Sequence, residues 1–176
     1  IILGNRKELF DVLFDASSYT LLKFAADTQY IGAQPGITSV LHTWGQQLSF
    51  HPHVHCIVSG GGTNAANEWI PAKKSKYGSL FPVQALEPVF KAYFLKQLRK
   101  LKTDGTLRLT YHQEQNWNTL LNLLFSTKWI LYAKQPFGGP QQVVEYLGRY
   151  THKVAISNHR IKKVDQQGNT TFDYKD

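Results

Sequence analysis

Apolar residues recur every three or four positions in three long stretches of the chain, at residues 4–26, 86–101 and 116–125. This is the period of one face of an α-helix, so each stretch is predicted to form an amphipathic helix. Asn5 stands at the start of the first stretch and is predicted to be its N-cap. A fourth helix is predicted over residues 141–152, because Pro140 suits the first turn of a helix.

Runs rich in β-branched residues predict the strands. Residues 37–44 form one run after a turn sequence that contains Pro and Gly, and residues 51–58 form the next. The short connection between the two runs predicts an antiparallel pair. The glycines at 60–62 are predicted to end the second strand in a mobile loop. Further strands are predicted over residues 107–111, over residues 128–134 as a central strand, and in a hairpin over residues 154–174.

This mixture of helices and strands predicts an α+β fold in which an antiparallel sheet is backed by helices. The chain has 176 residues, of which 42% are hydrophobic, so it is long enough to bury a core and is predicted to be one domain over residues 1–176. No apolar run is long enough to cross a bilayer, and Cys56 alone cannot form an internal disulfide. We therefore expect a cytoplasmic protein with no membrane partner.

Histidines cluster in the second predicted strand, at His51, His53 and His55. Alternate side chains of a strand share a face, so His53 and His55 point the same way and can hold one metal ion, with positions left for water or phosphate oxygens. The simpler alternative is a pair of exposed or hydrogen-bonded histidines. Cys56 points to the opposite face and is interpreted as buried filling. Polar residues that end the preceding strand are expected near the metal, chiefly His42, Gln46 and Gln47.

Two tyrosines lie one turn apart in the last predicted helix. Tyr146 and Tyr150 are four residues apart, so their hydroxyls project from one face. Alone, the pair is most simply explained by rings that pack inward while the hydroxyls meet solvent. Arg149, His152 and Lys153 place positive charge beside the pair, which suits a bound phosphate.

The net charge of the chain is +8. A surplus of this size indicates a polyanionic partner. Lys73 and Lys74 stand in a polar stretch after the glycines, and further lysines follow the helix at 86–101. The basic helix face is either an ordinary solvated face or a face that follows phosphates.

Taken together, these motifs resemble the HUH endonuclease superfamily, and within it the two-tyrosine transposases of rolling-circle bacterial insertion sequences, including the common-region elements. The resemblance covers nearly the whole chain, in the order found in the family. It rests on four blocks, HTWGQ at 42–46, HPHVHC at 51–56, AKQPFGGP at 133–140 and YLGRYTHKVAISN at 146–158.

The resemblance implies an HUH-nuclease fold of the ferredoxin or RRM type. It also implies a transposase that nicks and rejoins single-stranded DNA of the element ends and target through a 5′-phosphotyrosine link. His53, His55 and a third polar side chain would hold Mg²⁺ or Mn²⁺, and Tyr146 and Tyr150 would be the nucleophiles. The residues expected to bind DNA are Arg149, His152, Lys153, Lys73 and Lys74.

The third metal ligand is open at this stage. We favour Gln47, followed by Gln46 and His42, with Glu145 and His152 as alternatives on the tyrosine helix. Family members usually carry an N-terminal cysteine-rich zinc-binding region and a first sheet strand, and they continue past the last hairpin. This sequence shows none of the three, so we interpret it as a catalytic-domain fragment that is unstable or inactive if those parts are essential.

Two other classes of function fit part of the pattern. A non-catalytic module that binds single-stranded nucleic acid by stacking bases on aromatics such as Trp44, or a decayed transposase, would bind without metal and leave no covalent adduct. A zinc hydrolase built on His53 and His55 would need a third strong ligand and a bound water, and would leave the tyrosine pair without a role.

Overall fold

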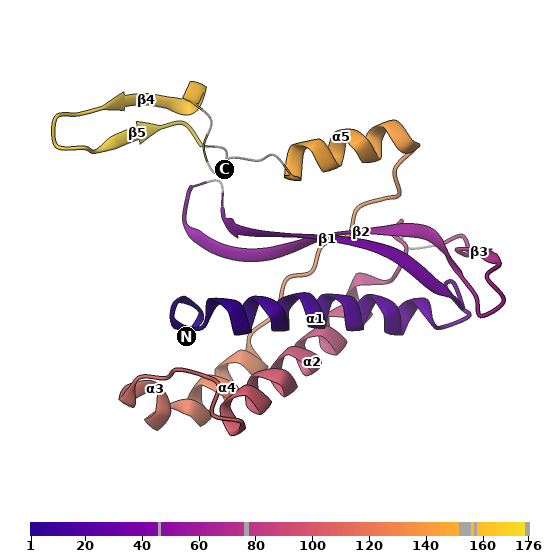
Figure 1. Cartoon of the computed structure of the whole chain (residues 1–176), viewed down its shortest axis with the longest axis horizontal. Coiled ribbons are helices and arrows are strands. Elements are labelled where there is room, and N and C mark those ends of the chain that lie inside the picture. The colour runs from indigo at the N-terminus through magenta and orange to yellow at the C-terminus, as the bar shows by residue number, and fades with distance from the viewer. Residues whose placement is uncertain (46, 76–77, 152–155, 157, 175–176) are drawn as a thin grey trace. The chain divides into compact units, whose positions relative to one another are not determined.

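The computed structural model describes residues 1–45, 47–75, 78–151, 156 and 158–174, without the side chains of residues 149–151 and 158 (Figure 1). Its helices are α1 (Arg6–Ala25), α2 (Val83–Thr103), α3 (Tyr111–Gln115), α4 (Trp117–Ser126) and α5 (Pro140–Thr151), with short 3₁₀ turns at Ile2–Gly4 and Asn158–Arg160. Its strands are β1 (Gln34–Trp44), β2 (Phe50–Thr63), β3 (Trp69–Pro71), β4 (Ile161–Val164) and β5 (Thr170–Phe172).

The strands form two antiparallel sheets, one in the order β1-β2-β3 and the other a β4–β5 hairpin. The predicted α+β fold with an antiparallel sheet and helices is therefore confirmed. The chain divides into two compact units, one made of residues 1–39 and 56–136 and the other of residues 40–55 and 137–176. Within the described residues, no helix is long and apolar enough to cross a membrane.

The β1–β2 hairpin fixes which side chains share a face. Gly36 N–H donates to Ser59 Oγ at 3.0 Å, and Ser39 Oγ lies 3.3 Å from Cys56 Sγ. At the other end, Gly45 N–H donates to the Ser49 carbonyl and closes the turn. Cys56 is half-buried rather than fully buried, and this burial raises the pKa of its thiol.

The helices of the first unit pack around two apolar clusters. α1 and α2 lie side by side (Figure 1). Leu9, Leu95, Leu98 and Trp117 belong to one cluster, which joins α1, α2 and α4. The second cluster surrounds Phe81 near the end of α1. These contacts give the unit a core that does not depend on the β4–β5 hairpin.

Asn5 lies at the predicted N-cap position but acts differently. Its side chain makes no capping hydrogen bond. It is 1% exposed, donates to the carbonyls of Ile1 and Arg108, and accepts a hydrogen bond from the Arg108 N–H. Asn5 therefore ties the start of α1 to the chain that follows α2.

The glycines at 60–62 lie inside β2, so the predicted mobile loop is wrong. A Cβ on Gly61 would lie 2.5 Å from the Ile70 carbonyl oxygen, and a Cβ on Gly62 would lie 2.6 Å from the Gln34 carbonyl oxygen. These glycines let neighbouring backbones approach on both sides of β2. Close strand contact, rather than chain flexibility, explains the presence of Gly61 and Gly62.

We expect Gly62→Ala to lower the free energy of unfolding by about 2 kcal/mol, because the new methyl group meets backbone that cannot rotate away. Gly60→Ala is the matched control, since nothing lies within 4 Å of its added Cβ. Chemical denaturation of the two variants measures the difference. Equal stability would contradict the packing explanation.

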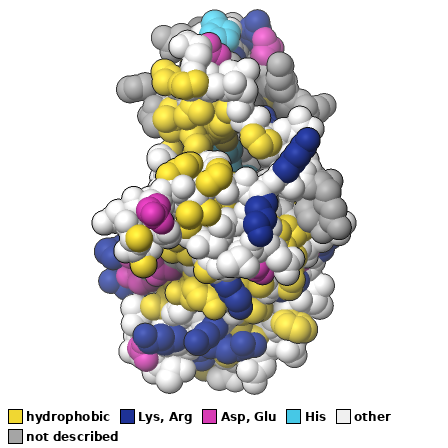
Figure 2. All heavy atoms as spheres, turned by 90° about the vertical axis from the view of Figure 1, so that its right-hand side faces the viewer, with side chains coloured by type: hydrophobic (Ala, Val, Ile, Leu, Met, Phe, Trp, Pro, Cys, Tyr) yellow, Lys and Arg dark blue, Asp and Glu magenta, His cyan; other side chains and the backbone are white. Residues whose placement is uncertain are grey.

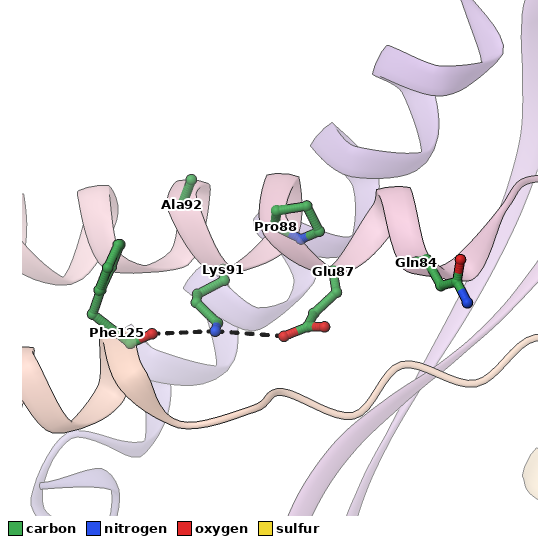
Figure 3. Close-up of a pocket in the computed structure, with 6 residues that line it drawn as sticks. All are labelled: Gln84, Glu87, Pro88, Lys91, Ala92 and Phe125. Atoms are coloured by element: carbon green, nitrogen blue, oxygen red, sulfur yellow. Dashed lines mark hydrogen bonds and ion pairs between the residues drawn. The ribbon is translucent and has the colours of Figure 1, made fainter.

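Residues 128–134 are extended but form no strand with any described residue, so the predicted central strand is wrong. The chain is instead held by α2 where the segment begins, and Figure 3 shows Lys91 of α2 between Glu87 and the Phe125 carbonyl. Glu87 accepts the Trp129 N–H at 3.1 Å, and this hydrogen bond is the main reason that the pKa of Glu87 is lowered. Lys91 pairs with Glu87 at 3.4 Å and donates to the carbonyls of Phe125 and Thr127.

The remaining corrections are local. Residues 107–111 form no strand, and Thr110 instead caps α3 through a capping box with Gln113. The predicted hairpin is present as β4 and β5, with residues 154, 155 and 157 outside the description.

Candidate metal centre and nucleophile

Three histidines of the second unit form one cluster. His42 lies on β1, and His53 and His55 lie on β2. One nitrogen of each ring lies within 4.8 Å of a nitrogen of each of the other two rings. The ring centroids are 4.6 Å apart for His42 and His55, and 4.9 Å for His53 and His55. The predicted shared face of His53 and His55 is therefore present, with a third imidazole beside it.

The hairpin register explains why His42 joins the pair. Ser39 faces Cys56 across the hairpin. The strands run in opposite directions, so a step of three residues forward from Ser39 and three residues back from Cys56 brings His42 opposite His53. Side chains alternate between the two faces of a strand, so a step of three residues leads to the opposite face. Both histidines therefore lie on the face opposite to Ser39 and Cys56.

The backbone orients one of the three histidines. His53 Nδ1–H donates to the carbonyl of His51 at 2.7 Å. In a neutral imidazole this hydrogen bond places the ring proton on Nδ1, which makes Nε2 the nitrogen with the chemistry of a metal ligand. His51 is exposed, and its backbone carbonyl contributes to the site through this contact.

Trp44 supports His42 from its side. Their rings stack with centroids 5.6 Å apart and planes 11° from parallel, and His42 is only 3% exposed. The Trp44 Nε1–H is buried and has no hydrogen-bond partner within the described part of the chain. A buried donor of this kind calls for a polar acceptor, such as water or a phosphate oxygen. Sequence alone indicates only that Trp44 could stack on a base, and nothing in it marks the contact with His42.

Tyr146 reaches the cluster from α5. Its Oη lies 3.2 Å from Nδ1 of His55, so the phenol and the imidazole share a hydrogen bond. The ring of Phe137 packs edge-on against Tyr146 at 5.3 Å and limits how the tyrosine can rotate. The Gly138 N–H donates to Gln142 Oε1, which steadies the chain just before α5.

The other predicted site residues fall into two groups. Gln47 lies exposed in the turn between β1 and β2, and Glu145 is exposed on α5, where it accepts a hydrogen bond from Gln141. Lys73 and Lys74 are exposed after β3 in the first unit. The remaining predictions lie outside the described residues, namely Gln46, His152, Lys153 and the side chains of Arg149 and Tyr150.

The donor set fits a divalent transition-metal ion. The distance between a metal ion and a histidine nitrogen is about 2.1 Å, so small ring movements would let all three imidazoles coordinate one ion. Imidazole suits transition metals better than Mg²⁺, which prefers oxygen ligands. Gln47 stays a prediction as third ligand, whereas the geometry brings His42 to the pair.

Comparison with known proteins places this site in a family. Residues 36–176 match the model of the Y2 transposase family, whose description is "Putative transposase". The chain is 39% identical over 178 residues to "Putative transposase y4qJ" of Sinorhizobium fredii, covering 98% of this chain and 44% of that protein. It is 28% identical over 172 residues to the transposase for insertion sequence element IS801 of Pseudomonas savastanoi pv. phaseolicola, covering 96% of this chain and 40% of that protein.

The chain thus spans less than half the length of these two curated relatives. No solved structure matches it. The family match includes the three clustered histidines, the HPHVHC block and α5 with both tyrosines. On this evidence the chain belongs to the Y2 transposase family.

Proposed function

We propose that this chain carries the nicking and rejoining centre of a transposase that acts on single-stranded DNA at insertion-sequence ends. The observation that carries the proposal is the hydrogen bond between Tyr146 and His55, a member of the histidine cluster. Phosphoryl transfer to tyrosine requires the tyrosine hydroxyl to lie beside the metal ion that activates the phosphodiester, and a tyrosine in contact with a candidate metal ligand fits this requirement.

His42, His53 and His55 are the proposed ligands of a divalent metal ion, with Mn²⁺ favoured over Mg²⁺ because all three donors are nitrogens. When bound, the ion would polarise the scissile phosphodiester and stabilise the negative charge that develops on it. With Nε2 as the ligand atom, His55 carries its proton on Nδ1. This N–H would donate a hydrogen bond to the oxygen of Tyr146.

Tyr146 attacks the phosphorus in line with the departing oxygen. The bond between Oη and phosphorus forms while the bond between phosphorus and the 3′ oxygen breaks. The phenol releases its proton to water, and the 3′ oxygen takes one up to become a hydroxyl. The covalent link retains the energy of the cleaved bond, so a later 3′-hydroxyl reverses the step without ATP.

Tyr150 follows Tyr146 by one turn of α5. In the proposed cycle it serves as the second nucleophile, so that one site holds two strand ends during cleavage and transfer. Phe137 packs against the ring of Tyr146 and restricts its rotation. Arg149, His152 and Lys153 are proposed to hold the phosphates on either side of the cleaved bond.

A zinc hydrolase would also use three histidines. The contact between Tyr146 and His55 argues against it, because a hydrolase would place a water rather than a tyrosine beside the metal. The family match argues in the same direction.

The direct test incubates the chain with labelled single-stranded DNA from an element end, with Mn²⁺ or with EDTA. We expect a protein–DNA adduct that survives denaturation with Mn²⁺ and is absent with EDTA. Denaturing gel electrophoresis detects it through its slower migration. An adduct of equal yield in EDTA would contradict metal assistance, and intact DNA with bound protein under both conditions would favour a binding module.

A further inference from the structure

We propose that residues 128–134, all of which belong to the first unit, form a second binding site for single-stranded DNA. The site is a row of alternate side chains, Lys128, Ile130, Tyr132 and Lys134, here called the outward row. The proposal does not depend on tyrosine chemistry, because binding at this row needs neither metal nor nucleophile.

The outward row follows from how the segment is anchored. Trp129 and Leu131 face inward and pack against the two apolar clusters of the unit. Lys128, Ile130 and Tyr132 alternate with these two residues and face the other way. The inward side ends at Leu131, because Ala133 is exposed as well as Lys134. Ile130 is 89% exposed and Tyr132 is 81% exposed, and the two lysines are exposed as well.

The segment is anchored at its start and is not used for strand pairing. Glu87 accepts the Trp129 N–H, and Lys91 donates to the carbonyls of Phe125 and Thr127 just before the segment. Figure 3 shows Lys91 between Glu87 and the Phe125 carbonyl. From residue 130 to residue 135 no backbone hydrogen bond joins the segment to another described residue. Its N–H groups are therefore able to donate to phosphate oxygens.

The chemistry of the row favours DNA over a protein strand. Lysines on an extended edge discourage the addition of another strand, and two of them frame this row. An exposed tyrosine offers a flat face on which a base can stack, and lysines bind the phosphates to either side. Alternate residues of an extended chain repeat at about 6.6 Å, a spacing that a stretched single strand can follow.

Charge on the rest of the surface agrees with this assignment. One face of the molecule shows Lys and Arg side chains beside exposed hydrophobic side chains (Figure 2). The net charge of +8 attracts a polyanion and opposes self-association. The nearby acid, Glu87, pairs with Lys91 and also interacts with Lys128, so Lys134 is the lysine of the row for which no acidic partner is seen among the described residues.

The test is binding of a fluorescent oligothymidylate by anisotropy in EDTA, so that failure of the metal-dependent nicking leaves the result unaffected. We expect Tyr132→Ala to weaken binding about tenfold through loss of stacking, and Tyr132→Phe to bind like the wild type. Tyr111→Ala is the matched control, since Tyr111 is also 81% exposed but lies on α3, outside the row. A duplex of the same length should show no effect of Tyr132→Ala.

The lysines have a separate readout. Each lysine that pairs with a phosphate of a single strand adds about 0.7 to the steepness of log affinity plotted against log salt concentration. The double variant Lys128→Gln/Lys134→Gln should therefore reduce that steepness by about 1.4. Lys7→Gln, which removes an exposed lysine of α1, should leave the slope nearly unchanged.

Equal binding by Tyr132→Ala, Tyr111→Ala and the wild type would overturn the proposal. So would a Tyr132→Ala variant that keeps its DNA affinity but loses self-association in sedimentation, because the row would then bind a protein strand. Unchanged thermal unfolding of each variant confirms that the change acts on the surface.

Discussion

Replacing both Tyr146 and Tyr150 by Phe is expected to abolish the covalent protein–DNA product, a loss of roughly a thousandfold or more. Only two hydroxyl groups are removed, so the ring of Tyr146 keeps its packing against Phe137. DNA binding in EDTA should remain close to that of the wild type. The measurement is adduct yield on a denaturing gel with Mn²⁺ present.

The single variants assign roles within the pair. Tyr146 contacts His55, so Tyr146→Phe should reduce the first cleavage strongly. Tyr150→Phe should spare cleavage and reduce the later transfer of the strand. Tyr19→Phe is the control, because Tyr19 lies on α1 and stacks on Tyr93, outside the second unit. An adduct from the double variant would show that the nucleophile lies elsewhere.

Removing any one of the three clustered histidines is expected to weaken Mn²⁺ binding roughly a hundredfold and to stop nicking. His53→Ala and His55→Ala test the predicted pair. His42→Asn tests the third member, with a polar residue chosen because position 42 is buried. Calorimetric titration with Mn²⁺ measures the affinity directly, without relying on activity.

Two controls make this result specific. His112→Ala removes a histidine of α3, outside the cluster, and should leave Mn²⁺ affinity unchanged. Gln47→Ala decides between the two candidates for third ligand. If Gln47→Ala abolishes Mn²⁺ binding while His42→Asn does not, the sequence-based ligand is correct and the proposed role of His42 is wrong.

Helices α1, α2, α4 and α5 and the first two strands were predictable because their information is local, whereas α3 was missed. The apolar period at residues 4–26 became the single helix α1, and Pro140 does open α5. The shared face of His53 and His55 follows from strand geometry alone, since alternate side chains must point the same way. The family resemblance was likewise readable from short blocks, and the family match confirms it.

Other features depended on contacts between distant residues. Gly61 and Gly62 carry turn-like chemistry, yet close approach by Ile70 and Gln34 keeps them in a strand. Residues 128–134 have the composition of a central strand. Yet Glu87 of α2 binds the Trp129 N–H, Lys91 of α2 binds the adjoining Thr127 carbonyl, and the segment pairs with no described strand. Local propensity cannot report such neighbours, because they come from elsewhere in the chain.

The sequence by itself determined the family, the α+β class, the histidine pair and the position of two tyrosines on one helix. Only the tertiary structure decided that His42 completes a cluster and that Tyr146 touches it. The physical reason is register. Which residue of β1 faces His53 depends on the length of the turn and on the match between Ser39 and Cys56, and a shift of one residue would have turned His42 to the other face.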